Sequence, residues 1–214
     1  MKIPDKLEFD TIIPEAKASK AIISLHGWQG NRSSFQQVCR SMNITDAQWF
    51  FPEAPYLAKE DDRQRSWSIE NSPGVWEMDK PRQLLDDFFS NHIWPAYSPC
   101  DVYVMGFSQG ALVCFEFILQ MNKPLGGVFP IAGFLRDPDA ERPRIHPSQK
   151  QTPILIGHGR DDDIVPLSAS QRAYDALKNQ GANVRLLVYK GKHKIGLTFL
   201  NEMKKILKNG SWEL

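Results

Sequence analysis

DVYVMGFSQGALVCFEFIL, residues 101–119, is the most informative stretch of this chain. DVYVM is a short apolar run rich in β-branched and aromatic residues, which predicts a buried strand. ALVCFEFIL has a helical pattern, and between the two lies Gly106-Phe107-Ser108-Gln109-Gly110, a G-x-S-x-G sequence. A strand that leads through such a sequence into a helix is typical of a nucleophile elbow, where the serine occupies a sharp, strained turn. We therefore expect Ser108 to be a nucleophile; the alternative is a plain glycine-rich strand–helix turn.

Apolar strand-like runs and helical patterns alternate on both sides of this unit. The predicted strands are 21–26, 101–107, 126–132, 153–158 and 184–189, and the predicted helices are 33–42, 80–94, 109–121, 168–180 and 197–208. Near-continuous apolar strands joined through helices are typical of a parallel sheet that is buried on both faces. The sequence therefore predicts an α/β fold with a mostly parallel central sheet and helices on both faces.

The length of 214 residues, without a visible repeat or interdomain linker, predicts a single domain over residues 1–214. Two segments interrupt the alternation: residues 52–79, rich in Pro, Trp and charge, and residues 134–152, polar and proline-bearing. Long irregular connections in a compact domain are usually functional loops or lids. For the second segment a variable surface excursion is an equally good interpretation, and neither segment is long enough for a large cap domain.

Composition narrows the classes of function. Apolar residues make up 42% of the chain and charged residues 24%, as in soluble globular proteins. A formal net charge of +1, with scattered Lys and Arg, argues against nucleic acid as a partner. The sequence shows no signal-like leader and no apolar run of membrane-spanning length, so we expect no stable membrane insertion. Three cysteines at irregular spacing argue against a disulfide framework and a metal site, which favours a cytoplasmic location.

A serine hydroxyl needs a base to become a nucleophile. The chain has five histidines: His26, His92, His146, His158 and His193. In α/β-hydrolase folds the chain order is serine, acid, histidine, which excludes the two histidines that precede Ser108. His146 comes too early for an acid to intervene, and His158 ends a strand, where a hydrogen-bonded structural role is the ordinary interpretation. His193 lies between the last predicted strand and the last predicted helix, and is the expected base.

The acid is expected in the loop after the strand 153–158, whose sequence is GRDDDIVP (159–166). Asp161, Asp162 and Asp163 cannot all face one imidazole, and two of them are expected to be solvated or to cap a turn. Periodicity does not choose among the three.

Taken together, these features resemble the carboxylesterase/phospholipase family, which includes acyl-protein thioesterases and lysophospholipase-like bacterial esterases. The matching blocks are LHGWQGN (25–31), FPEAPY (51–56), SW (66–67), GFSQGA (106–111), HGRDDDIVP (158–166) and YKGKH (189–193). They are spread over most of the chain in the family's order. The resemblance implies an α/β-hydrolase fold without a large cap domain, and it implies neither a metal nor an organic cofactor.

The resemblance also implies roles for single residues. The family's acid block, H-G-x-x-D-x-x-V-P, places the acid at Asp162, its serine matches Ser108 and its histidine matches His193. In these roles the histidine takes the serine proton and later protonates the leaving group, while the carboxylate holds the imidazole tautomer. The backbone N–H groups of Trp28 and Gln109 are the expected oxyanion hole.

Trp67 and Val165 are expected, by the same resemblance, to contact the substrate. Trp67 is equally well interpreted as a partly buried aromatic that anchors the long loop. The chain departs from the family pattern at residues 28–29, where smaller residues are common, and this predicts a narrower acyl pocket. Lys192 is a second departure, and its ammonium group would lower the pKa of His193 if it lay close to the imidazole.

We expect a serine carboxylesterase or thioesterase that acts on small acyl esters or thioesters, with short to medium acyl chains, as a monomer or homodimer. A peptidase or carbon–carbon-bond hydrolase on the same scaffold would use the same three groups. A non-catalytic protein of this fold that binds a ligand or a protein is the alternative from a different class. Labelling of Ser108 by a fluorophosphonate separates the enzymes from the binding protein.

Overall fold

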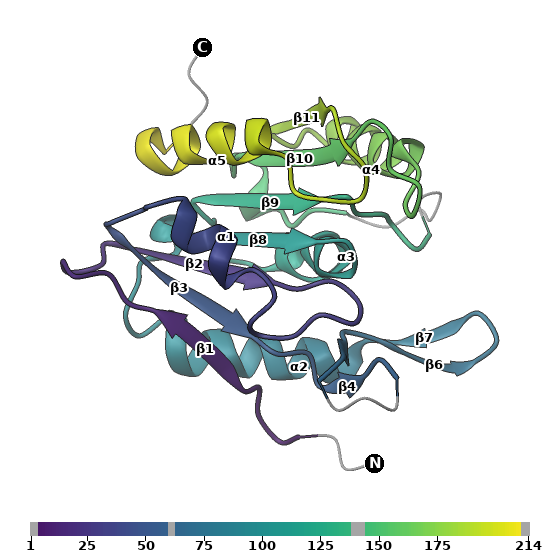
Figure 1. The fold of residues 1–214 in the computed structure, drawn as a ribbon, viewed down its shortest axis with the longest axis horizontal. Coiled ribbons are helices and arrows are strands. Elements are labelled where there is room, and N and C mark those ends of the chain that lie inside the picture. The colour runs from purple at the N-terminus through teal and green to yellow at the C-terminus, as the bar shows by residue number, and fades with distance from the viewer. Residues whose placement is uncertain (1–3, 60–62, 138–143, 211–214) are drawn as a thin grey trace.

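A seven-stranded sheet forms the centre of the molecule (Figure 1). This computed structural model describes residues 4–59, 63–137 and 144–210. In spatial order the strands are β1 (Phe9–Ile12), β3 (Ala47–Pro52), β2 (Lys20–Leu25), β8 (Val102–Phe107), β9 (Gly127–Ile131), β10 (Ile154–Gly159) and β11 (Val184–Tyr189). All neighbours pair in parallel except β1, which pairs antiparallel with β3. The predicted mostly parallel sheet is confirmed.

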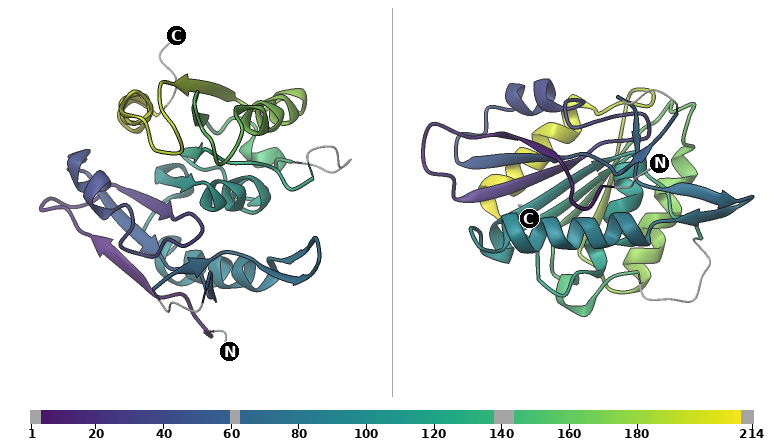
Figure 2. Two further views of the ribbon diagram at one scale, coloured as in Figure 1. Left: turned by 45° about the vertical axis from the view of Figure 1, so that its right-hand side comes forward. Right: turned by 90° about the horizontal axis from the view of Figure 1, so that it is seen from below.

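Helices cover both faces of this sheet (Figures 1 and 2). One face carries α2 (Asp79–Phe88), α3 (Gln109–Glu116) and α4 (Leu167–Asn179), and the other carries α1 (Gln36–Ser41) and α5 (Leu197–Asn209). Each face has its own apolar cluster, and consecutive strand residues alternate between them. In β2, for example, Ile23 belongs to the first cluster and Ile22 to the second. Because both faces are buried, these strands have the near-continuous apolar sequences that predicted them.

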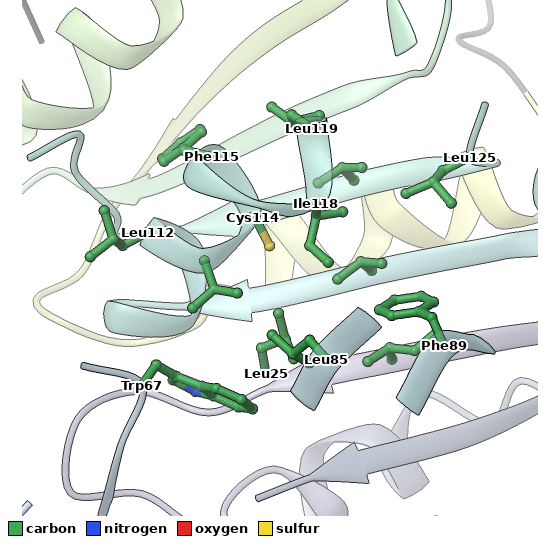
Figure 3. Packing of buried hydrophobic residues seen from close by; sticks show 14 of the residues in the cluster. Leu25, Trp67, Leu85, Phe89, Leu112, Cys114, Phe115, Ile118, Leu119 and Leu125 are labelled. Atoms are coloured by element: carbon green, nitrogen blue, oxygen red, sulfur yellow. The ribbon is translucent and has the colours of Figure 1, made fainter. Parts of the chain in front are cut away.

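The apolar cluster on the face that carries α2, α3 and α4 contains residues from the predicted helices 80–94 and 109–121. This cluster includes Leu85 of α2 and Phe89 just after it, together with Leu112 and Cys114 of α3 (Figure 3). The predicted helix 80–94 continues beyond α2 as a π-helical turn, Phe89–Ile93. The predicted helix 109–121 ends in a 3₁₀ turn, Ile118–Gln120, after α3.

The irregular segment 52–79 contains four short strands that the sequence did not indicate. These are β4 (Tyr56–Leu57), which pairs with β5 (Arg65–Ser66), and β6 (Ile69–Ser72), which pairs with β7 (Val75–Glu77). The β6–β7 hairpin projects from the body of the molecule (Figure 1). Of the other irregular segment, 134–152, residues 138–143 lie outside the described part of the chain, and Pro147–Gln149 form a 3₁₀ turn.

The three cysteines have different environments. Cys39 and Cys114 are buried, and burial raises the pKa of both thiols, that of Cys39 to about 12. Cys100 is exposed and lies just before β8. In the part of the chain that the structure describes, no helix combines the length and apolar character needed to cross a bilayer.

Six strands, from β3 through β11 in the spatial order, run in the same direction, so their carboxyl ends meet at one edge of the sheet. In open α/β sheets this edge is where sites are built, because the loops that leave it converge there. The segments after β2, β8, β10 and β11 contain the residues singled out by sequence, except Trp67, which follows β5.

Candidate active site

Ser108 lies at the turn between β8 and α3 with backbone angles of φ 54° and ψ −113°. This conformation is strained for a residue with a Cβ atom and needs support from its surroundings. The Ser108 N–H donates to the carbonyl of Ile131 in β9 at 2.8 Å, and its carbonyl accepts from the N–H groups of Ala111 and Leu112 at 3.0 and 3.1 Å. The backbone is therefore held on both sides of the serine.

The two glycines of the motif allow the helix to approach the sheet closely. A Cβ atom on Gly110 would lie 2.2 Å from the carbonyl oxygen of Leu25 in β2. A Cβ atom on Gly106 would lie 2.3 Å from the carbonyl oxygen of Gly110. Both contacts are with backbone atoms, which cannot move aside cheaply, so the turn around Ser108 requires glycine at these positions.

Asp162 is the one aspartate of the loop after β10 that turns inward. Its side chain has 0% exposure, and Oδ1 accepts hydrogen bonds from the N–H groups of Ile164 and Val165, both at 2.9 Å. Oδ2 accepts from Nδ1 of His193 at 2.7 Å. Burial raises the pKa of the carboxyl group, but these hydrogen bonds outweigh it and leave the pKa below its ordinary value. The carboxylate is thus ionised and fixed in position.

The other two aspartates of this loop, Asp161 and Asp163, are exposed. Asp163 pairs with the ammonium group of Lys192 at 2.9 Å. The ammonium group of Lys192 is therefore engaged by a carboxylate at the surface.

His193 follows β11 and contacts the acid, Asp162, through Nδ1. Because its Nδ1 donates to Asp162, Nε2 is the unprotonated atom of the neutral ring. The imidazole packs against the ring of Phe107, with centroids 4.7 Å apart, next to Ser108 in the chain. Among the described residues the Ser108 hydroxyl forms no hydrogen bond. Hydrogen bonds between catalytic groups are often long or poorly aligned until a substrate binds.

The loop after β2 lies directly against the serine. A Cβ atom on Gly27 would be 3.3 Å from the Cβ atom of Ser108. The backbone N–H groups of Trp28 and Gln109 donate to no acceptor within residues 4–59, 63–137 and 144–210. Two unused N–H groups beside a serine are the arrangement that stabilises an oxyanion.

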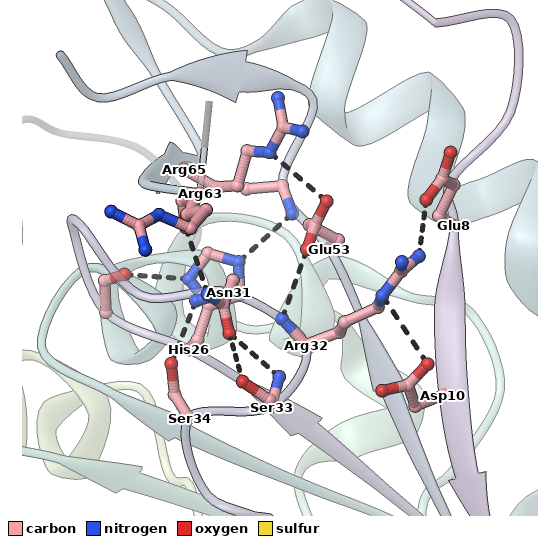
Figure 4. Close-up of polar contacts among 12 residues, drawn as sticks. Glu8, Asp10, His26, Asn31, Arg32, Ser33, Ser34, Glu53, Arg63 and Arg65 are labelled. Atoms are coloured by element: carbon pink, nitrogen blue, oxygen red, sulfur yellow. Dashed lines mark hydrogen bonds and ion pairs between the residues drawn. The ribbon is translucent and has the colours of Figure 1, made fainter. Parts of the chain in front are cut away.

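His26 holds the start of this loop through two hydrogen bonds, and its imidazole is neutral. Its Nδ1 donates to the carbonyl of Gly27 at 2.7 Å, and its Nε2 accepts from the N–H of Ala54 at 3.1 Å. Burial lowers its pKa to about 4, against the raising effect of the bond to Gly27. Figure 4 shows the imidazole among these contacts, with Asn31 and Arg32 further along the loop.

Polar contacts fix the remainder of the same loop (Figure 4). Asn31 donates from Nδ2 to the carbonyl of Arg63 at 2.9 Å and accepts at Oδ1 from the N–H of Ser33 at 2.9 Å. Arg32 forms ion pairs with Glu8 and Asp10. The loop is therefore tied both to the start of the chain and to the segment that follows β4.

The two residues predicted to contact the substrate have mainly internal contacts. Trp67 has 0% exposure, and its indole N–H donates to the carbonyl of His26 at 2.9 Å, so its geometry favours the anchoring interpretation. Val165 is 8% exposed, and its carbonyl accepts from Nε2 of His158 at 2.9 Å. His158 is buried and also contacts the hydroxyl of Ser170 at 2.7 Å, which is the structural role expected of it.

Sequence reasoning missed the polar partners of the Gln109 side chain, which are Ser66 and Ser68. The block SW (66–67) indicates a role for its tryptophan alone. The only local signal is a tryptophan between two serines, Ser66 and Ser68, and this pattern does not indicate a partner about forty residues away in the sequence.

A buried acid, an oriented imidazole, a serine on a strained turn and two unused N–H groups can together perform acyl transfer. A family model, Phospholipase/Carboxylesterase, matches residues 8–210 of the chain. Carboxylesterase SOBER1 of Arabidopsis thaliana is 26% identical over 188 residues, which cover 79% of this chain and 81% of that protein. Acyl-protein thioesterase 1 of Aspergillus fumigatus is 26% identical over 176 residues, 72% of each chain.

Two further comparisons concern activity and fold. A probable inactive carboxylesterase of Oryza sativa subsp. japonica is 28% identical over 189 residues, which cover 81% of this chain and 77% of that protein. Among solved structures, esterase PE8 has a TM-score of 0.80 at 24% identity and covers 95% of this chain and 98% of its own. The likeness to PE8 shows that this chain has the α/β-hydrolase fold, and the residues that the structure describes form no large cap domain.

Proposed function

Because the chain belongs to the phospholipase/carboxylesterase family, we propose that it hydrolyses carboxylic esters or thioesters through an acyl-enzyme on Ser108. The observation that most supports this is the 2.7 Å contact between His193 and the buried, ionised Asp162, beside a serine held on a strained turn. An acid in that environment fixes the imidazole with Nε2 as the base.

The reaction has two halves. Oγ of Ser108 attacks the carbonyl carbon while Nε2 of His193 takes the hydroxyl proton, and the N–H groups of Trp28 and Gln109 bind the oxyanion. The carbon–oxygen or carbon–sulfur bond then breaks, and the imidazolium gives its proton to the leaving alcohol or thiol. Water attacks the acyl-enzyme with the same base, which releases the carboxylic acid and restores the serine.

We propose short to medium acyl chains as substrates. Trp28 supports this, because its bulky indole, 54% exposed, belongs to the residue immediately after Gly27, where an added Cβ atom would lie 3.3 Å from the Cβ atom of Ser108. We also propose Val165 as a neighbour of the substrate. Its backbone N–H donates to Oδ1 of Asp162, whose other carboxylate oxygen contacts His193, so Val165 lies next to the proposed catalytic groups.

Hydrolysis of p-nitrophenyl esters from acetate to palmitate tests the proposal. Ser108→Ala is expected to lose about 10³-fold or more in kcat, because no other group supplies the nucleophile. Ser41→Ala, at an exposed serine of α1, is the control and is expected to retain full activity.

One relative is a probable inactive carboxylesterase, so a non-catalytic protein of this fold is the second candidate. Fluorophosphonate labelling distinguishes the two. Folded wild type that neither labels at Ser108 nor cleaves any ester would overturn the enzyme proposal in favour of ligand binding.

A further inference from the structure

The residue after the nucleophile also has a well-placed side chain. Gln109 is 7% exposed, and its Oε1 accepts from the backbone N–H of Trp67 at 2.9 Å. Its Nε2 donates to the hydroxyl oxygens of Ser66 and Ser68, both at 2.9 Å. One amide group therefore holds three consecutive residues.

The orientation of this amide is fixed by its partners. The Ser66 hydroxyl donates to the carbonyl of Ser68 at 2.6 Å, so its oxygen is free to accept from the Gln109 NH₂ group. The Trp67 N–H is a donor only, so it must face the amide oxygen. A flipped amide would place two donors against each other, so the network has a single arrangement.

The same segment holds the other side of the proposed oxyanion hole. We name residues 65–68 the brace. The indole N–H of Trp67 donates to the carbonyl of His26 at 2.9 Å. The backbone of Arg65 accepts from the N–H of Gln29 at 3.0 Å and donates to the carbonyl of Gly30 at 2.9 Å. The brace therefore joins the Gln109 side chain to the loop on both sides of Trp28.

We propose that the Gln109 side chain is a positioning residue that sets the distance between the N–H groups of Trp28 and Gln109. This inference rests on the proposed function, because those two groups matter only if an oxyanion forms. The Trp28 N–H belongs to the loop after β2 and the Gln109 N–H to the first residue of α3, which follows β8, and the brace is bonded to both segments. Oxyanion donors act only when they are aimed before the charge develops.

Gln109→Met tests this directly, because methionine keeps the backbone N–H and a similar length but removes the amide. Gln149→Met is the matched control. Gln149 has 0% exposure, and its amide also bonds to several partners, among them the carbonyl of Lys123 at 2.7 Å and the hydroxyl of Thr152 at 2.7 Å. Its partners precede β9 and β10, at the sheet edge opposite Ser108.

The readout is kcat per active site, with sites counted by complete fluorophosphonate labelling. We expect Gln109→Met to lower this kcat about 10–100-fold, less than or comparable to the loss of a whole oxyanion donor. KM is expected to stay within about twofold, and the midpoint of the pH–rate profile to stay unchanged, because His193 and Asp162 are untouched. Gln149→Met is expected to keep the wild-type kcat per site.

Hydrogen exchange gives a readout that is independent of turnover. Peptides that span residues 27–30 and 65–68 are expected to exchange faster in Gln109→Met than in wild type, and to be unchanged in Gln149→Met. If Gln109→Met does not fold, Ser68→Ala removes one partner of Nε2, and a several-fold loss of kcat at constant KM is expected.

Equal kcat per site in wild type and Gln109→Met, or in wild type and Ser68→Ala where that variant replaces it, would overturn the inference and leave the amide a packing role. A wild type that neither labels nor turns over would instead refute the proposed function. The inference would fall with it, while the exchange data would still report the brace. The two failures are thus distinguishable.

Discussion

Acidification should destabilise the protein through His26, well above the pH at which carboxylates protonate. The imidazole is 1% exposed, and Nε2 is occupied by the Ala54 N–H, so a second proton has no place without loss of that bond. Burial is the main cause that lowers the pKa to about 4, and the charge of Arg65 adds to it. An unfolded histidine has a pKa of about 6.5.

The sign follows from proton binding. Between pH 6.5 and pH 4 the unfolded chain binds a proton at this residue and the folded chain does not, so stability falls as pH falls. The contribution is complete above pH 6.5 and is lost progressively toward pH 4. With 1.36 kcal/mol per pKa unit, the loss amounts to about 2 kcal/mol at pH 5 and about 3 kcal/mol at pH 4.

Urea unfolding of wild type and His26→Asn at pH 7.5, 6.5 and 5.0 measures this. Asparagine keeps a donor for the Gly27 carbonyl, but it is smaller than histidine and loses the bond from the Ala54 N–H, so the variant is expected to be less stable at pH 7.5. Because asparagine does not titrate, the stability of the variant is expected to depend less on pH. The stability difference between the two proteins is expected to shrink by about 2 kcal/mol at pH 5. Asp162, with its lowered pKa, titrates below this window in both proteins. Parallel pH curves for the two proteins would refute the reasoning.

Three other substitutions have defined outcomes. Asp162→Asn is expected to lower kcat about 10²–10⁴-fold in ester hydrolysis while the protein stays folded by circular dichroism, and near-normal turnover would contradict its assigned role. Gly110→Ala is expected to destabilise by about 3 kcal/mol in thermal unfolding, since its Cβ would lie 2.2 Å from the Leu25 carbonyl; an unchanged Tm would show that the helix can shift. Lys192→Ala should leave the midpoint of the pH–rate profile unchanged, because the ammonium group pairs with exposed Asp163, and a shifted midpoint would indicate a direct effect on the imidazole.

The parts of the fold that the sequence predicted have local signals. The strands of the parallel sheet that the sequence predicted are apolar along most of their length, and the helices repeat apolar residues every three to four positions. β1 and β3 were missed for physical reasons. β1 is four residues of intermediate burial at the edge of the sheet, and β3, AQWFFP, lacks β-branched residues and ends in proline.

The features of the site also separate into those that have a local sequence signal and those that do not. The motif around Ser108 is contiguous, so its turn could be inferred from sequence. The choice among three adjacent aspartates depends on which one turns inward, and only the resemblance indicated Asp162, the residue that contacts His193. The contacts of Gln109 with Ser66 and Ser68 span 43 and 41 positions, and no local pattern encodes them.

The distribution of the cysteines makes site-directed immobilisation straightforward. A maleimide surface near neutral pH should capture the protein through Cys100, because the other two thiols are buried and their pKa values are raised. Cys100 precedes β8 and Ser108 follows it, so the length of the six-residue strand, roughly 20 Å, separates the tether from the serine. The attached molecules would share one orientation, with the carboxyl edge of the sheet directed away from the support and open to the solution.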